Sequence, residues 1–102
     1  MVYLLSVNTT RFEWDEKKNQ SNQQKHGLSF ADAPRVFAGR TLTFEDSRQV
    51  YGEPRYLTVG SLAGRVVIMA HTLRGDATQL ISMRKANARE TARSQERLGQ
   101  DR

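Results

Sequence analysis

From Thr41 onward the chain contains four short segments rich in β-branched and apolar residues that recur with a period of two. The segments are TLTFED (41–46), RYLTVGSL (55–62), RVVIMAHT (65–72) and ATQLISMR (77–84). Turn signals separate them, namely YGEP at 51–54, Ala63-Gly64 and Arg74-Gly75-Asp76. Because connections this short join neighbouring strands running in opposite directions, the pattern predicts an antiparallel four-stranded meander.

Two of these segments carry further information. The run from Val66 to Ala70 is continuously apolar, which is typical of a central strand covered on both faces. The last segment alternates, so every second side chain is expected on the same face. One face would carry Leu80, Ser82 and Arg84, and the other Ile81, Met83 and Lys85.

A first helix is predicted within FEWDEKKNQSNQQKHG (12–27). Asp15 can cap its N-terminus, and Gly27 can take the left-handed conformation that ends it. The interior from Lys17 to Gln24 is almost wholly polar and has no apolar stripe. Core packing alone cannot hold such a helix, so it is either weakly docked or its polar face serves another purpose.

A second helix precedes the strands and a third follows them. Ser29 can cap the second helix, which would run to about residue 37, but Pro34 does not fit the interior of a helix. Either the helix bends there, or it starts later with Asp32 as its cap. Asn87, with an acidic residue three positions later, approximates a capping box for a helix through about Leu98.

Helices on either side of an antiparallel sheet define an α+β domain. In a chain of 102 residues we expect one domain at 11–98, an extension or short strand at 1–10, and a tail at 99–102. The apolar start from Val2 to Val7 is too short to span a membrane, and a cytoplasmic protein is expected. The net charge of +5 suggests a polyanionic partner, most often nucleic acid, or an acidic protein.

Three stretches follow one another in a recognisable order: FEWDEKKNQSNQQKHGLSFADAPRVF (12–37), YGEPRY (51–56) and HTLRGDATQLISMRKA (71–86). With these stretches the sequence resembles the BrnT family of bacterial type II toxins, within the RelE-like ribonuclease superfamily. The resemblance implies a RelE-like fold and an endoribonuclease that needs no metal ion or cofactor and inhibits translation. It also implies a cognate BrnA-like antitoxin with a ribbon-helix-helix domain, through which alone operator DNA would be bound.

Metal-independent RNA cleavage uses the neighbouring 2′-hydroxyl as nucleophile, and it needs a base, an acid and cations at the phosphate. The catalytic candidates are His26, Lys25, Arg84 and Tyr51. Lys25 and His26 match the family's Lys-His-Gly motif, although cations in a last helical turn also simply offset the helix dipole. Arg84 matches the arginine that is taken as a phosphate contact in the RelE-like pattern. Arg84 and His26 are expected to share one cleft.

Further basic residues and histidines stand at strand ends, where an RNA-binding role and a plain solvated surface are both open. The RNA-binding candidates are Lys85, Arg74, His71, Arg55 and Arg65. Two positions depart from the family pattern, which often has a basic residue where Gln79 stands and an aromatic one where Ser94 stands. Such changes would weaken catalysis, so the alternative function is a non-catalytic or weakened homologue that binds nucleic acid or the antitoxin.

Overall fold

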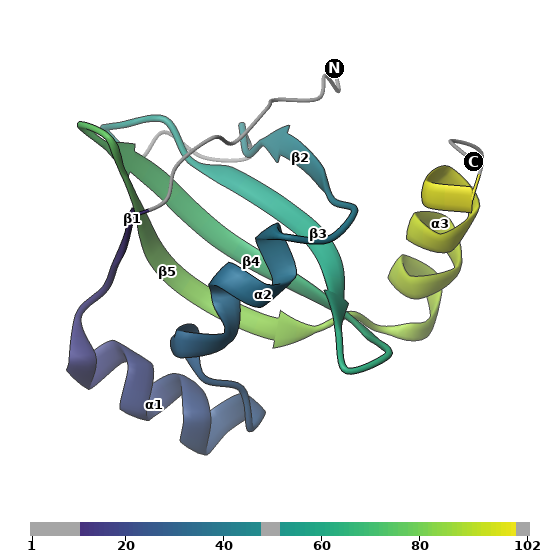
Figure 1. Cartoon of the computed structure of the whole chain (residues 1–102), viewed down its shortest axis with the longest axis horizontal. Helices are drawn as coiled ribbons and strands as arrows, with labels where there is room; N and C mark the ends of the chain where they lie inside the picture. Colours follow the sequence, from purple (N-terminus) through teal and green to yellow (C-terminus); the bar gives the residue numbers. More distant parts are fainter. Residues whose placement is uncertain (1–10, 48–51, 100–102) are drawn as a thin grey trace.

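The computed structural model of the chain describes residues 11–47 and 52–99 (Figure 1). The predicted N-terminal extension at 1–10 and the candidate Tyr51 lie outside the described residues. The elements, in chain order, are β1 (Arg11–Glu13), α1 (Glu16–His26), a 3₁₀ turn η1 (Phe30–Asp32), α2 (Ala33–Phe37), β2 (Leu42–Glu45), β3 (Tyr56–Leu62), β4 (Arg65–Arg74), β5 (Ala77–Lys85) and α3 (Ala88–Gly99).

The strands of the described residues form one sheet in the order β1-β5-β4-β3-β2. Strands β2 to β5 are the predicted antiparallel meander, which is confirmed. The four-stranded sheet expected from the sequence is nevertheless incomplete, because β1 pairs in parallel with β5 and makes the sheet five-stranded and mixed. A three-residue strand is too short to show a period, so its pattern gave no signal.

Apolar side chains cover both faces of the central strand β4, as predicted. On one face Val67 and Met69 join the main core, together with Phe30 and Val36 from η1 and α2. Figure 1 shows α2 lying across this face and α3 standing to one side of the sheet. On the other face Ile68 belongs to a second, smaller apolar cluster. The side chains of α3 reach toward this second face.

Strand β5 contains a β-bulge that overturns the predicted alternation. Ala70 pairs with Ser82, but the next residue of β4, His71, pairs with Leu80, so Ile81 is an extra residue in the ladder. Leu80 and Met83, three positions apart, therefore both belong to the main core. Assigning them to opposite faces was wrong, because the regular period of two does not continue through a bulge.

Helix α1 docks through buried amides. The Asn22 Oδ1 accepts a hydrogen bond from the backbone N–H of Met83 at 3.0 Å, and its Nδ2 donates to the Leu28 carbonyl at 3.0 Å. The Asn19 Oδ1 accepts from the Phe30 N–H at 2.9 Å. Because β1 pairs with β5 only at residues 77–79, Asn22 supplies an acceptor farther along the same edge. The polar face of α1 thus replaces an apolar stripe.

The predicted ends of α1 are found with their expected chemistry, whereas Asp32 precedes α2 without a capping side-chain hydrogen bond. The Asp15 carboxylate accepts from the Lys17 N–H at 2.8 Å, and Gly27 ends α1 at φ 70°. Helix α2 begins at Ala33, so Pro34 lies in its first turn, where no N–H is needed. This is the later start, and the Ser29 hydroxyl caps η1 instead. None of the helices within residues 11–47 and 52–99 is long and apolar enough to cross a membrane.

Candidate functional site

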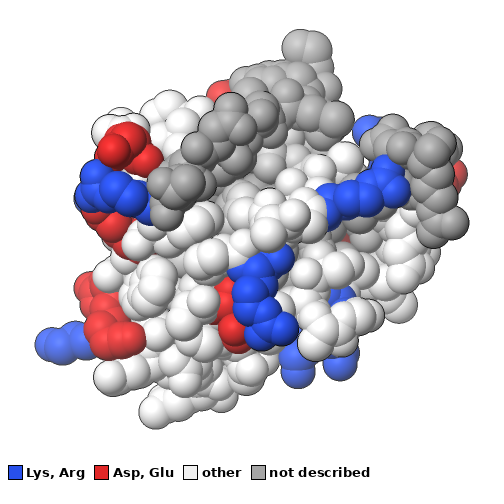
Figure 2. All heavy atoms as spheres, in the orientation of Figure 1, with Lys and Arg blue, Asp and Glu red and all other residues white. Residues whose placement is uncertain are grey.

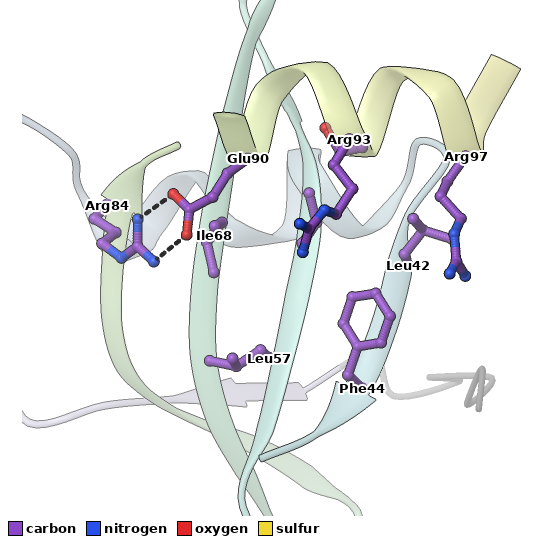
Figure 3. Close-up of a pocket in the computed structure, with 10 residues that line it drawn as sticks. Leu42, Phe44, Leu57, Ile68, Arg84, Glu90, Arg93 and Arg97 are labelled. Carbon is purple, nitrogen blue, oxygen red and sulfur yellow. Dashed lines mark hydrogen bonds and ion pairs between the residues drawn. The ribbon is translucent and has the colours of Figure 1, made fainter. Parts of the chain in front are cut away.

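Two hollows in the described part of the chain are lined by basic side chains. The first, called here the α3 hollow, has a volume of about 360 Å³ and lies between α3 and the second face of the sheet (Figure 3). The second, called here the α1 hollow, has a volume of about 330 Å³ and lies between α1 and the bulged part of β5. Both volumes fall at the lower end of the range typical of ligand sites.

The α3 hollow combines an apolar floor with a charged rim. The floor comes from β2, β3 and β4 and consists of Leu42, Phe44, Leu57, Val59 and Ile68. The rim comes from β5 and α3 and consists of Arg84, Glu90, Arg93, Ser94 and Arg97. Figure 3 shows Arg93 and Arg97 reaching from α3 over the floor. Since they are four residues apart, they project from the same face of the helix.

Arg84 is held at the rim by a bidentate ion pair with Glu90. Its two terminal nitrogens donate to the two Glu90 carboxylate oxygens, each at 2.8 Å (Figure 3). Glu90 also accepts from the Asn87 N–H at 2.9 Å, and Asn87 accepts from the Glu90 N–H in return, which is the predicted capping box. The hydrogen bonds from Arg84 lower the pKa of Glu90 to about 2. This carboxylate is therefore ionised at neutral pH and fixes the plane of the guanidinium.

Both departures from the family pattern fall on the α3 side of the sheet. Ser94 lines the α3 hollow, is buried, and donates its hydroxyl to the Thr91 carbonyl at 3.0 Å. Gln79 pairs with Thr72, and Arg84 pairs with Ile68, which lies four residues earlier in β4. Residues an even number apart in a strand share a face, so the bulge brings Gln79 and Arg84 to the same face.

The α1 hollow is polar and basic. It is lined by Lys17, Lys18, Ser21, Asn22, Lys25 and His26 from α1 and by Ile81 and Ser82 from β5. The three lysines are exposed, whereas His26 is half-buried. No acidic residue is among the described residues that line it. Its charge is therefore uniformly positive, in contrast to the α3 hollow, where Glu90 stands among the arginines.

Arg84 and His26, which were expected to share one cleft, line different ones of these two hollows. Arg84 lines the α3 hollow, and Lys25 and His26 line the α1 hollow. The two hollows have no lining residue in common. The sequence suggested one site because both motifs are basic, but the position of α1 at the β5 edge separates them.

His71 is a core residue. Only 1% of its surface is exposed, and its Nε2 lies 2.7 Å from the Thr58 hydroxyl, which in turn bonds the Thr43 hydroxyl at 2.8 Å. Its ring stacks on Tyr56 and meets Phe37 edge-on. Burial lowers the pKa of His71 to about 4. The imidazole is thus neutral, and its burial keeps it out of reach of RNA.

The remaining candidates lie at two opposite ends of the strands. Arg55 directly precedes β3, and Arg74 ends β4, where its guanidinium donates to the Glu53 carboxylate at 3.4 Å. Arg65 begins β4 at the other end of the hairpin, opposite Leu62. Lys85 ends β5 and is exposed. Arg55 and Arg65 therefore lie at opposite ends of the hairpin formed by β3 and β4.

The positive charge is not gathered into one broad patch on the face seen in Figure 1. Figure 2 shows basic side chains there in separate groups, several of them beside acidic ones. Within residues 11–47 and 52–99, no three His, Cys, Asp or Glu residues lie together in a way that could bind a metal ion.

Several site residues were not singled out from the sequence. Arg93 and Arg97 lie in the predicted third helix, and Glu90 is the acidic residue of its capping box. The spacing of these three residues is a usable signal for a common helix face. Lys17 and Lys18 belong to the polar interior of the predicted first helix, whose pattern assigns them no site. Their common hollow depends on how α1 packs against β5, which no local pattern encodes.

One comparison with known proteins identifies a family, and the other finds nothing. A search of curated proteins gives no match. A family model described as "Ribonuclease toxin, BrnT, of type II toxin-antitoxin system" matches residues 14–90. This range includes α1, the whole meander and Glu90, and it exceeds half of the chain. The chain therefore belongs to the BrnT family of type II toxin–antitoxin ribonuclease toxins, a family that implies an RNA substrate and a protein antitoxin as partner.

Proposed function

We propose that this chain is a metal-independent endoribonuclease that cleaves RNA through the neighbouring 2′-hydroxyl, and that the α3 hollow binds the phosphodiester that is cut. The observation that carries the proposal is the presence of three arginines, Arg84, Arg93 and Arg97, around one hollow. Guanidinium groups bind phosphate oxygens in pairs and keep their charge at any physiological pH.

In the proposed reaction the 2′-oxygen attacks the adjacent phosphorus, and the bond from phosphorus to the 5′-oxygen breaks. The 2′-hydroxyl loses its proton, and the leaving 5′-oxygen gains one, so the products are a 2′,3′-cyclic phosphate and a 5′-hydroxyl. Negative charge develops on the phosphorane oxygens. Arg84 would stabilise that charge, since a pre-oriented cation costs no reorganisation during the reaction. Glu90 acts as a positioning residue that orients Arg84.

The apolar floor suits the nucleobase next to the cut. Phe44 and Leu57 are partly buried and border the hollow beneath Arg93 and Arg97 (Figure 3). RNA-binding proteins commonly stack unpaired bases on aromatic rings while cations contact the backbone. A floor of this kind with arginines on its rim fits a nucleotide better than it fits a lone phosphate.

We further propose that the family's partner is, for this chain, a BrnA-like antitoxin with a ribbon-helix-helix domain that contacts the operator. The toxin would act in the cytoplasm as a RelE-like enzyme and inhibit translation by cutting mRNA. The support is the BrnT assignment together with the net charge of +5, which favours an acidic protein segment.

A weakened or non-catalytic homologue is the second candidate function. Gln79 and Ser94 favour it, because both lie on the α3 side, where the family often has a basic and an aromatic residue. Loss of one transition-state contact lowers a rate by about 100-fold to 1000-fold. The hollow would then still bind RNA through its arginines.

The test is an RNA-cleavage assay in excess EDTA, with a matched substrate that carries a 2′-deoxy sugar at the cut site. Cleavage of the all-ribose substrate alone, with a 2′,3′-cyclic end, is the expected result. Arg84→Ala should lower the rate about 100-fold. Arg40→Ala, an exposed arginine outside both hollows, should leave it unchanged. Equal rates for the two variants would remove Arg84 from the reaction.

The same assay distinguishes a weakened or non-catalytic homologue from an active endoribonuclease. A wild-type protein that binds RNA but leaves it intact, and that gains cleavage when Gln79→Arg is combined with Ser94→Tyr, would identify a weakened enzyme. If neither protein cuts the all-ribose substrate, the cleavage proposal is wrong.

A further inference from the structure

Helix α1 carries positive charge at its N-terminus, where lysines do not stabilise a helix. Lys17 and Lys18 lie in its first turn, where the positive end of the helix dipole favours acidic residues instead. Lys25 lies about 12 Å farther along the axis, two turns later. All three side chains border the α1 hollow. The helix dipole favours the position of Lys25 in the last turn, but it does not account for Lys17 and Lys18 in the first.

The walls of the α1 hollow are fixed by the same contacts that dock the helix. Asn22 is buried, borders the hollow, and joins α1 to the Met83 N–H of β5. Ile81 and Ser82 on the opposite wall belong to the β-bulge. The lysines thus project from a helix that is tied to the sheet, and the hollow is a preformed concavity.

We infer that the α1 hollow is a second RNA-binding site, which binds the ribose-phosphate backbone of the strand beyond the cut and takes no part in cleavage. In this assignment Lys25 and His26 hold substrate and are not catalytic residues. The inference rests on the proposed RNA substrate. It goes further by giving the enzyme two separate contacts with one RNA strand, of which only the one in the α3 hollow reacts.

The lining favours a nucleic-acid backbone over an acidic protein segment. Among the described residues that line the hollow, Ile81 is the one apolar side chain, and none is Phe, Tyr or Trp. A bound polypeptide usually needs buried apolar or aromatic anchors, and lysine is depleted in the cores of such interfaces. Lysine ammonium groups suit phosphates as mobile point charges, without sequence selectivity. The hydroxyls of Ser21 and Ser82 add neutral donors for phosphate or ribose oxygens.

The test measures the salt dependence of RNA binding. The probe is a mixed-sequence 2′-O-methyl RNA of about 20 nucleotides, which exceeds the roughly 4–16 nucleotides that a single-strand-binding domain covers. This probe keeps the phosphates but has no 2′-hydroxyl, so it cannot be cut. The variant is Lys18→Gln with Lys25→Gln, and the control is Arg35→Gln with Arg40→Gln, which removes the same charge from exposed positions outside both hollows.

Each phosphate contact of a single strand contributes about 0.7 to the slope of log affinity against log salt concentration. The lysine variant should therefore reduce the slope by about 1.4, and the arginine control should leave it near the wild-type value. An unchanged slope in the lysine variant, or an equal reduction in the control, would overturn the inference. So would a lysine variant that binds RNA normally but loses the antitoxin.

Cleavage of a dinucleotide distinguishes this inference from the proposed function. A dinucleotide is too short to reach beyond the cut, so the lysine variant should cleave it at the wild-type rate. A loss of dinucleotide cleavage in a variant that folds normally by circular dichroism would make the α1 hollow part of the reacting site and overturn the inference. If the wild type itself cuts nothing, the cleavage proposal fails, while the salt slope still decides whether the α1 hollow binds RNA.

Discussion

The buried histidine of β4 should make the stability of this protein depend on pH between 7 and 5. His71 is 1% exposed, and burial lowers its pKa from 6.5 to about 4. Protonation would place a charge in the core and add a proton to a ring whose Nδ1 has no hydrogen-bond partner among the described residues. The unfolded chain has no such penalty and binds the proton near pH 6.5.

The direction and size of this change in the free energy of unfolding follow from the linkage between proton binding and folding. Because the folded state binds the proton more weakly, the stabilisation is fully present above pH 6.5 and is lost as the pH falls toward 4. Each pKa unit corresponds to about 1.36 kcal/mol. With a pKa of 6.5 in the unfolded chain and about 4 in the folded protein, the free energy of unfolding should fall by about 2 kcal/mol between pH 7 and pH 5. Glu90, with its pKa lowered from 4.5 to about 2, loses its contribution only below that window.

Urea denaturation at the two pH values measures this effect. The wild-type midpoint should fall by roughly 1–2 M. His71→Gln removes the titrating group, so the variant should be less stable than the wild type at pH 7 but nearly insensitive to this change of pH. The difference between the two pH dependences isolates His71 from every other group. If wild type and His71→Gln lost the same stability from pH 7 to pH 5, the reasoning would be refuted.

Two further changes test the packing that positions the sites. Asn22→Ala leaves the buried Met83 N–H without its acceptor and should lower the free energy of unfolding by about 2 kcal/mol, whereas Gln23→Ala on the exposed side of α1 should change it little. Gly60→Ala would bring a Cβ to 2.6 Å from Val36 Cγ1 of α2 and should cost about 1–3 kcal/mol. Gly39→Ala, where the nearest contact is an ordinary 3.6 Å, is its control. The urea midpoints of all four variants report these changes. Equal midpoints for the two variants of α1 would contradict the contact between Asn22 and Met83. Equal midpoints for the two glycine variants would contradict the close approach of Gly60 to Val36.

Elements whose signals are local could be predicted from the sequence. The caps of α1 and the turns that join β3 to β4 and β4 to β5 depend on a few neighbouring residues, and they were found where expected. What escaped prediction depends on distant partners. Strand β1 pairs with β5 across 66 residues, as Arg11 with Ala77. His71 is buried because Tyr56 and Thr58 of the neighbouring strand enclose it, and no residue near it in the sequence signals this.

The β-bulge at Ile81 explains why the candidate site could be only half predicted. In a regular strand Leu80 and Arg84 share a face, so burying Leu80 in the main core would also turn the guanidinium of Arg84 toward that core, at a high cost in desolvation. The extra residue changes the parity, so that Leu80 and Met83 are both buried while Arg84 faces α3. The same change brings Gln79 to the face of Arg84, although five positions separate them. A basic residue at position 79 would therefore stand on the face where the cut phosphate is proposed to bind. We therefore expect a basic residue at position 79 to change the proposed cleavage rate and to leave the fold unchanged.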